Sequence, residues 1–438
     1  MATENKISKC TYPVDSTVSA APFAWEKGKE IDPMPVPPKF LRYGQQHIDD
    51  DDIQAVIEVL QSSNLTQGPK VAEFEHALCE TVGSRFGVAF NSGTSALHSA
   101  CLAAGVGPGD EVITSPITFV ASANCAVYCG AKPVFADILP DTYNISPGEI
   151  EKKITVHTKA VIPVDLAGQS CDMEAIQTVV SSAEKKYGHR IYIIEDASHA
   201  LGSLYKGRKV GSCAYADVTV MSFHPVKHIT TGEGGVAFTN DEGLMKKLRL
   251  LRSHGMTGEP EEFQNREMAF SKASGGESLV NPWYYEQISL GYNYRITDIQ
   301  CALGLSQLKK LPLFRKRRHE IVEAYNEAFR DIRCIHPPFE SPDCNSNFHL
   351  YILLFDFEEM GMDRARFMYE LKARSIQTQV HYIPVHLQTF YKRHLGTKWG
   401  DYPRAEAYYE KCLSIPLYPA MTDEDVELVI FEIKERMG

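Results

Sequence analysis

The sequence predicts an α/β protein with a mostly parallel central sheet flanked by helices and a smaller C-terminal α+β domain. Between residues 86 and 239, short apolar runs alternate with helical patterns. The runs are apolar on both faces, which is typical of a parallel sheet buried between two layers of helices. We expect strands at Phe86–Phe90, Glu111–Ser115, Pro133–Asp137, Ala160–Asp165, Ile191–Asp196, Asp217–Met221 and Gly235–Thr239.

Apolar residues at helical spacing predict the elements around this sheet. Two helices are expected before the first strand, within residues 48–61 and 70–82. After Asn293, the run ITDIQCALGLSQLKKL predicts a long amphipathic helix, and a further helix and several short strands should follow it. Helices between the strands are expected at Thr94–Ala104, Ser122–Tyr128 and Met173–Tyr187.

Length and composition suggest three parts. A chain of 438 residues with 44% hydrophobic residues exceeds what one compact core usually holds. Residues 1–40 are proline-rich and show no periodicity, so we expect an extended or disordered arm. Residues 41–290 should form the large domain and residues 291–438 the small one. The polar stretch 256–282 is too irregular for a firm assignment, and long loops of this kind often serve as lids.

Charge and cysteine usage exclude several classes of protein. The net charge is −11, and residues 315–318 form the only basic run, so nucleic acid is not expected as a partner. The eleven cysteines are scattered without a CxxC pair, which predicts neither a disulfide framework nor a metal site. A reducing cytoplasm fits this usage. No run approaches the roughly 20 apolar residues of a membrane span, so no membrane partner is expected.

Lys227 is the most informative single residue. It lies between the apolar run 218–223 and the glycine-rich turn 232–235, in SFHPVKHITTGEGG. A lysine amine becomes nucleophilic when it is deprotonated, and partial burial lowers its pKa toward the working pH. Glycines allow the backbone to approach a bulky ligand. The alternative is a solvated surface lysine.

Other strand ends also carry groups suited to a ligand, because parallel sheets bind ligands there. Thr94 and Ser95 begin a helix directly after a strand, where free N–H groups and hydroxyls attract a phosphate. The alternative is an ordinary capped helix. Neither a GxxxxGK[ST] nor a GxGxxG motif is present at this position, which argues against a nucleoside triphosphate.

Two adjacent acids, Glu195 and Asp196, end another strand. A buried carboxylate needs a partner, and a protonated pyridine nitrogen would provide one. A salt bridge to Arg208 or a helix cap would serve equally well. His199 could contact a cofactor or be a structural histidine. Phe119 could stack on a flat ring or pack in the core.

A phosphate cradle, an aromatic side chain, an acid and a lysine, in this order along an α/β chain, are the parts that pyridoxal phosphate requires. With these parts in this order, the sequence resembles the DegT/DnrJ/EryC1/StrS aminotransferases, which are fold-type I enzymes that aminate nucleotide-linked keto sugars. The resemblance extends from about Arg42 to the C-terminus. It rests on the motifs NSGTSALH, GDEVITSPITFVASAN, EDASHALG, SFHPVK, TGEGG and GYNYRITDIQCALGLSQL.

The resemblance implies a role for each matching residue. Lys227 matches the Schiff-base lysine, and Asp196 matches the acid that pairs with the pyridinium nitrogen. Asn293 matches an asparagine that reaches the phosphate from the neighbouring subunit, which implies a homodimer with shared active sites. Arg295 could lie near the substrate or pair with Asp298. The remaining cofactor-binding matches are Thr94, Ser95, Ser222, Phe119 and His199.

Within the family, the segments HPVK, TTGEGG and QVHYIPVH are most similar to transaminases of pseudaminic acid synthesis. This similarity implies that L-glutamate donates its amino group to the C4 ketone of a UDP-linked 4-keto-6-deoxy-N-acetylhexosamine. It also implies that His381, Tyr382 and His386 lie near the sugar.

Three alternatives remain open. The chain could aminate a different nucleotide-linked 3- or 4-keto sugar. It could be a pyridoxal-dependent sugar dehydrase, although related 3-dehydrases carry histidine in place of the Schiff-base lysine. It could also be a non-catalytic binding protein on the same fold.

Overall fold

The computed structural model describes residues 39–272 and 278–437. The arm expected over residues 1–40 therefore lies almost entirely outside the described residues. The described residues from Phe40 onward form one compact unit, and the division between residues 41–290 and 291–438 stays a prediction. Within the described ranges, no helix has both the length and the apolar composition that crossing a membrane requires.

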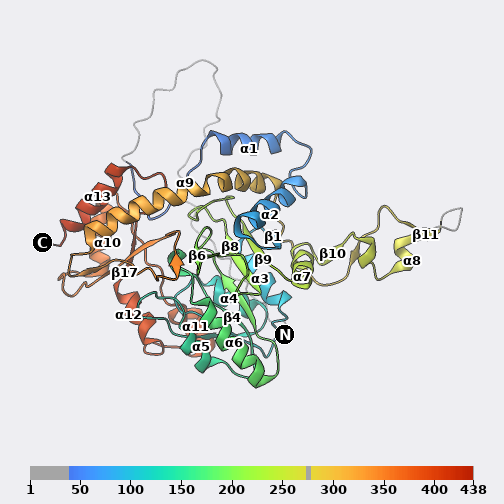
Figure 1. Cartoon of the computed structure of the whole chain (residues 1–438), viewed down its shortest axis with the longest axis horizontal. Coiled ribbons are helices and arrows are strands. Elements are labelled where there is room, and N and C mark those ends of the chain that lie inside the picture. Colours follow the sequence, from blue (N-terminus) through green and yellow to red (C-terminus); the bar gives the residue numbers. More distant parts are fainter. Residues whose placement is uncertain (1–38, 273–277, 438) are drawn as a thin grey trace, which may run out of the picture. The chain divides into compact units, whose positions relative to one another are not determined.

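A seven-stranded sheet organises residues 86–239 (Figure 1). Its strand order is β1-β9-β8-β5-β4-β2-β3. The four pairs from β8 to β3 are parallel, and β9 is antiparallel to both of its neighbours. The strands are β1 (Phe86–Phe90), β2 (Glu111–Thr114), β3 (Lys132–Phe135), β4 (Thr158–Ile162), β5 (Tyr192–Asp196), β8 (Val218–Ser222) and β9 (Gly235–Thr239). The predicted mostly parallel sheet is confirmed.

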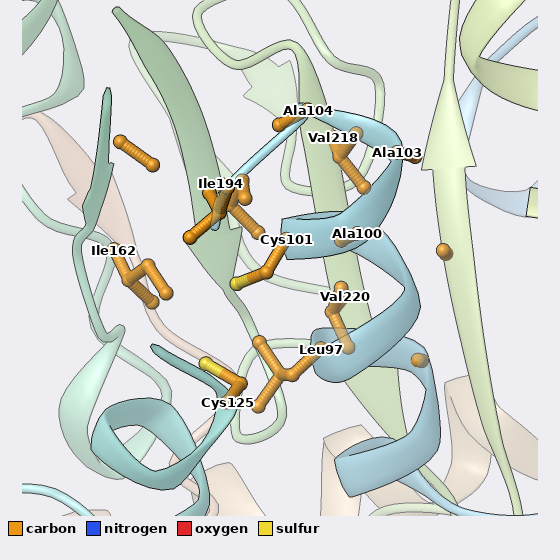
Figure 2. Packing of buried hydrophobic residues seen from close by; sticks show 14 of the residues in the cluster. Leu97, Ala100, Cys101, Ala103, Ala104, Cys125, Ile162, Ile194, Val218 and Val220 are labelled. Atoms are coloured by element: carbon orange, nitrogen blue, oxygen red, sulfur yellow. The ribbon is translucent and has the colours of Figure 1, made fainter. Parts of the chain in front are cut away.

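Helices cover both faces of this sheet because successive strand residues point to opposite sides. On one face, Val88, Ile194 and Val220 pack against helices α3 (Gly93–Ala103), α4 (Ala121–Tyr128) and α7 (Glu242–Arg252). Figure 2 shows Leu97, Ala100 and Cys101 of α3 facing strand residues that include Ile194, Val218 and Val220.

The opposite face is covered in two places. Beside β1, β8 and β9 lie α2 (Pro69–Val82) and α9 (Asp298–Phe329), with α1 (Asp50–Leu60) against α9. Beside β2, β4 and β5 lie α5 (Pro147–Lys153) and α6 (Met173–Tyr187). A small sheet of β6 (Leu204–Tyr205), β7 (Arg208–Lys209) and β15 (Cys344–Asn345) joins two distant parts of the chain.

The C-terminal region is built around the antiparallel sheet β14-β16-β17. Aromatic and aliphatic residues of this sheet pack against the second half of α9 and against α10 and α13. The elements of this region are β14 (Ile335–His336), β16 (Tyr351–Phe355), α10 (Arg364–Ala373), a 3-10 turn (Val385–Leu387), α11 (Thr389–Leu395), α12 (Pro403–Lys411), β17 (Cys412–Ile415) and α13 (Asp423–Lys434). Another 3-10 turn, Leu166–Gly168, follows β4 in the larger sheet region.

One detail differs from the sequence-based expectation. The helix expected to end near Leu311 continues through Pro312 to Phe329, so the two expected helices are one. Phe314, Ile321 and Tyr325, which follow Pro312 on α9, are buried. The free energy gained from their packing outweighs the cost of the helix hydrogen bond that proline, lacking an N–H, cannot make. The irregular stretch after α7 forms short pieces: β10 (Met256–Thr257), a 3-10 turn (Pro260–Glu262), α8 (Arg266–Ala269), β11 (Phe270–Lys272), β12 (Ser278–Val280) and β13 (Glu286–Gln287).

Candidate active site

A cavity of about 850 Å³ opens at the carboxyl ends of the sheet strands. This volume lies in the upper part of the roughly 300–1,000 Å³ typical of small-molecule sites. The strand ends of the sheet and a segment of the C-terminal region line it together. Nine of the predicted residues lie on its wall: Thr94, Ser95, Phe119, Asp196, His199, Ser222, Lys227, His381 and Tyr382.

Lys227 lies in the turn that connects β8 to β9. Its backbone N–H donates to the carbonyl of His224 at 2.8 Å, which closes this turn. Burial lowers the pKa of the Lys227 amine from 10.5 to about 8, although the nearby Asp196 acts in the opposite direction. At this pKa roughly a tenth of the amine is deprotonated at pH 7, far more than for an ordinary lysine, which suits a nucleophile or a proton carrier.

The N-terminus of α3 forms a cradle for an anion. Ser92 caps the helix by accepting from the N–H of Ser95 at 3.1 Å. A Cβ on Gly93 would lie 2.9 Å from Cβ of Ser222, so only glycine lets β8 approach this helix end so closely. The Ser95 hydroxyl donates to Asn91 Oδ1 at 2.6 Å. The hydroxyls of Thr94 and Ser222 and the helix N-terminus thus remain to bind a phosphate.

Asp196 ends β5 and is held by two serines. Its Oδ2 accepts from the Ser122 hydroxyl at 2.6 Å, and its Oδ1 accepts from the Ser198 hydroxyl at 2.6 Å. Neither bond is an ion pair, and Arg208, the alternative partner, is an exposed residue of β7. The carboxylate keeps acceptor capacity on the cavity side, which is what a pyridinium N–H needs.

Glu195 points to the opposite face of the sheet, because side chains alternate along a strand. Its Oε2 accepts from the Thr219 hydroxyl at 2.7 Å. Burial raises the pKa of Glu195 to about 7. Burial, followed by the charge of Glu195, also raises the pKa of Asp165. Of the two adjacent acids, therefore, only Asp196 faces the cavity.

Neutral imidazoles and a phenol lie on the loop that follows β5 and on loops of the C-terminal region. His199 Nε2 lies 3.2 Å from the Tyr382 hydroxyl, and its Nδ1 accepts from the N–H of Ala167 at 3.2 Å. The ring of His349 packs on His199 with centroids 4.4 Å apart. Burial, followed by the charge of Lys227, lowers the pKa of His199 and His349 well below 6.5. Burial likewise lowers the pKa of His381 to about 3.

Phe119 completes the fit to pyridoxal phosphate. It is 59% exposed on the cavity wall, where a flat ring could cover it. Together, Phe119, the anion cradle, the Asp196 acceptor and the Lys227 amine would hold the cofactor's ring, phosphate, ring nitrogen and aldehyde carbon. In the described part of the chain, no three histidine, cysteine or acidic side chains group as metal ligands would.

Two predicted residues do not line the cavity of this single chain. Asn293 is exposed, beyond the strand end that carries Asn91. His386 is fully buried, and its Nε2 lies 3.0 Å from Glu406 Oε1. The structure gives His386 no surface through which it could touch a sugar. Asp298, considered above as an ion-pair partner of Arg295, uses its carboxylate oxygens differently. They accept hydrogen bonds from the backbone N–H groups of Gly68 and Lys70.

Sequence reasoning missed several residues of the site. Ser122 holds Asp196, and its place at the start of a helix after a strand was a usable signal. His349 carried no local signal, because a single histidine before a strand is usually structural. Further lining residues that were not predicted include Tyr43, Glu233 and Gln388.

The fold and this site define a fold-type I enzyme that uses pyridoxal phosphate. The chain belongs to the DegT/DnrJ/EryC1/StrS aminotransferase family, whose model matches residues 46–434. It is therefore a sugar aminotransferase, as the sequence predicted.

Three similar proteins illustrate the match. Spore coat polysaccharide biosynthesis protein SpsC from Bacillus subtilis is 43% identical over 90% of this chain and 97% of its own length. PseC from Helicobacter pylori, an aminotransferase involved in pseudaminic acid biosynthesis, is 35% identical, with a TM-score of 0.80 over 91% of this chain and 99% of its own. The putative sugar aminotransferase Spr1654 from Streptococcus pneumoniae, in its PLP form, is 33% identical, with a TM-score of 0.80 over 91% and 99%.

Proposed function

We propose that this enzyme moves the amino group of L-glutamate to the C4 ketone of a UDP-linked 4-keto-6-deoxy-N-acetylhexosamine. The product is a 4-amino sugar for synthesis of a pseudaminic-type acid. The observation that carries the proposal is the position of Lys227 and Asp196 at the ends of neighbouring strands, on one cavity of about 850 Å³. The likeness to PseC supports the choice of sugar.

Lys227 is the proposed proton carrier of both half-reactions. With a pKa of about 8, its amine can accept a proton from the carbon of the amino donor and return one to C4 of the sugar. Its place in a turn closed by the bond to His224 lets the side chain reach the cavity without moving the sheet.

Bound pyridoxal phosphate supplies an electron-withdrawing ring that stabilises negative charge at the reacting carbon. Asp196 is proposed to keep the ring nitrogen protonated, since its negative charge lies at the end of β5 and is held by Ser122 and Ser198. Thr94, Ser222 and the α3 N-terminus are proposed to bind the phosphate, and Phe119 to cover the ring.

A homodimer with shared sites is part of the proposal. Among the described residues that line the cavity, Lys227 is the one lysine and no arginine is present. A phosphate and a nucleotide-linked substrate bring several negative charges, so further donors from a second copy would help. Asn293 is exposed and free to serve there. Large apolar residues of the nearby segment are also exposed, including Trp283 at 74% and Leu290 at 77%.

For the sugar, we propose contacts from His381 and Tyr382 and leave His386 out. His381 Nδ1 lies 2.7 Å from the Ser414 hydroxyl, which fixes its ring beside the cavity. His386 instead stabilises the loop around Glu406, which also accepts from the N–H groups of Gly400 and Tyr402. The cytoplasmic location stays a prediction from cysteine usage.

A panel of nucleotide-linked 3- and 4-keto sugars tests this function. Each sugar is incubated with the enzyme, pyridoxal phosphate and L-glutamate, and products are read by mass spectrometry. Amination of the UDP-linked 4-keto sugar is expected. Amination of only a 3-keto or non-UDP sugar would contradict the proposed substrate. Loss of a hydroxyl without gain of an amine would indicate a dehydrase.

A further inference from the structure

We propose that the Tyr382 hydroxyl is a fixed hydrogen-bond donor into the cavity and that His199 sets its direction. The acceptor is an oxygen at the reacting centre, either the phenolic oxygen of the cofactor or the carbonyl oxygen of the keto substrate. This inference rests on the proposed function. It adds a role for Tyr382 and His199, which follows from the contact between them.

The hydrogen bonds of His199 fix which nitrogen carries the proton. Nδ1 accepts from the backbone N–H of Ala167 at 3.2 Å, so Nδ1 itself is unprotonated. A neutral imidazole then has its proton on Nε2. His199 stays neutral because burial, and next the charge of Lys227, lower its pKa well below 6.5. The Nε2–H therefore donates to the Tyr382 hydroxyl, which lies 3.2 Å away.

Because Tyr382 accepts from His199, its own hydroxyl proton must point elsewhere. Tyr382 lines the cavity, and His199 is the one hydrogen-bond partner of its hydroxyl among the described residues. Burial, and then the negative charge of Asp196, raise the pKa of Tyr382 above its usual range, so the proton stays on the oxygen. The phenol is thus a neutral donor facing the cavity.

The surroundings hold this arrangement in place from three parts of the chain. The carbonyl of Ala167 accepts from the N–H of His349 at 2.8 Å, so Ala167 links both histidines. The buried Arg318 of α9 donates to the carbonyl of His349 at 3.1 Å. The ring of His349 packs on His199. A rigid donor of this kind stabilises developing charge better than a mobile one.

The charged and titratable groups near the pair come from several elements. Lys227 and His381 act on the pKa of His199, together with the buried His228. Asp196 and Tyr43 act on the pKa of Tyr382. Within the described ranges, none of these groups accepts the Tyr382 hydroxyl proton. The acceptor that we assign to this proton is therefore an oxygen of a bound ligand.

Tyr382→Phe, studied as the cofactor-loaded enzyme, gives the primary test. The visible absorbance of bound pyridoxal phosphate is titrated with pH in the absence of substrate. If Tyr382 donates to the phenolic oxygen, its removal should raise the titration midpoint by about one unit, because the deprotonated form loses a donor. If it donates to the substrate instead, the midpoint should stay, and single-turnover amination of the keto sugar should slow about tenfold.

Tyr408→Phe is the matched control. The Tyr408 hydroxyl donates to the carbonyl of His381 at 2.7 Å, so this variant also removes one phenolic hydrogen bond to the same segment. Tyr408 is buried and does not line the cavity. A loosened segment would affect both variants alike, whereas the proposed donor role affects Tyr382→Phe alone.

Two substitutions of His199 test the positioning role. Glutamine places an N–H near the position of Nε2 and can still donate to Tyr382, whereas asparagine reaches only the position of Nδ1. We expect His199→Gln to keep the wild-type titration midpoint or amination rate, whichever Tyr382→Phe changes. His199→Asn should match Tyr382→Phe, and the Asn/Phe double variant should be no worse than either single variant.

The outcomes separate this inference from the proposed function. If Tyr382→Phe matches Tyr408→Phe in both readouts, the donor role is wrong. If the wild-type enzyme aminates none of the sugars, the proposed function fails, and with it the keto substrate as the acceptor. The substrate-free titration then tests the phenolic oxygen of the cofactor as the one acceptor left, and an unchanged midpoint overturns the inference. A fully additive Asn/Phe double variant would show that His199 does not act through Tyr382.

Discussion

The two walls of the cavity differ in charge and in origin. The sheet wall, which includes Thr94, Asp196, Ser222 and Lys227, carries the charged carboxylate and amine of the site at strand ends. The C-terminal wall consists of neutral groups on loops, namely His349, Gln379, His381, Tyr382 and Gln388. Burial keeps its imidazoles uncharged, as the lowered pKa values of His349 and His381 show.

This difference suggests a division of work. Charges at strand ends are fixed to the most rigid part of the molecule, where they can hold the cofactor and move protons. Neutral donors and acceptors on loops can discriminate between substrates at a lower desolvation cost. Substitutions of the charged side chains in the sheet wall should therefore cost far more activity than substitutions in the C-terminal wall, where Tyr382→Phe is expected to cost about tenfold.

The largest effect is expected from Lys227→Ala. Without the amine there is no proton carrier, so amination should fall by at least about a thousandfold. The product is measured by mass spectrometry. Lys316→Ala, at an exposed helix position paired with Glu320, is the control and should leave activity unchanged. Turnover retained in Lys227→Ala would refute its role.

The next largest effect is expected from Asp196→Asn. It removes the negative charge but keeps the approximate shape, and amination should fall about a hundredfold. The matched control is Glu195→Gln on the same strand, whose side chain faces Thr219 and not the cavity. That variant should lose less than about tenfold. Similar losses in both variants would erase the distinction between the two adjacent acids.

A pH dependence follows from Lys227. Below its pKa of about 8 the amine is protonated and cannot attack the aldehyde. Capture of pyridoxal phosphate by cofactor-free enzyme should therefore speed up about tenfold per pH unit up to pH 8 and then level off. Stopped-flow absorbance measures this rate. A rise that continues to about pH 10.5 would indicate an ordinary solvated lysine.

The smallest effect is expected from Gly93→Ala. The added Cβ would meet Ser222 at 2.9 Å and force β8 and the α3 N-terminus apart by a few tenths of an ångström. Affinity for pyridoxal phosphate should fall several-fold, which corresponds to the free energy that one hydrogen bond contributes. Equilibrium titration of absorbance measures it. Gly107→Ala, where the new methyl meets no atom within 4 Å, is the control.

Much of the sheet wall could be predicted from the sequence. The strands are apolar runs with sharp ends, and the functional residues follow them directly, so position along the chain gives position in space. Lys227 and Asp196 were found in this way. Predicted element bounds were close to the observed ones, and the helix Met173–Tyr187 matches. Pro312 was misleading because its local cost is outweighed by packing along α9.

The C-terminal wall was predicted less well. His381 and Tyr382 came from resemblance, and the same segment suggested His386, which is buried against Glu406 instead. His349 was missed. These residues lie on loops whose direction depends on contacts far away in the sequence, such as those of Ala167 and Arg318 with His349.

The sequence by itself determined the α/β class, the order of the strands along the chain and the residues at their ends, because hydrophobic periodicity and motif spacing are local properties. The tertiary structure alone decided which serines hold Asp196, which imidazoles remain neutral and that His386 is buried away from the cavity. Those properties depend on burial and on partners brought together from distant positions, for which a linear pattern carries no signal.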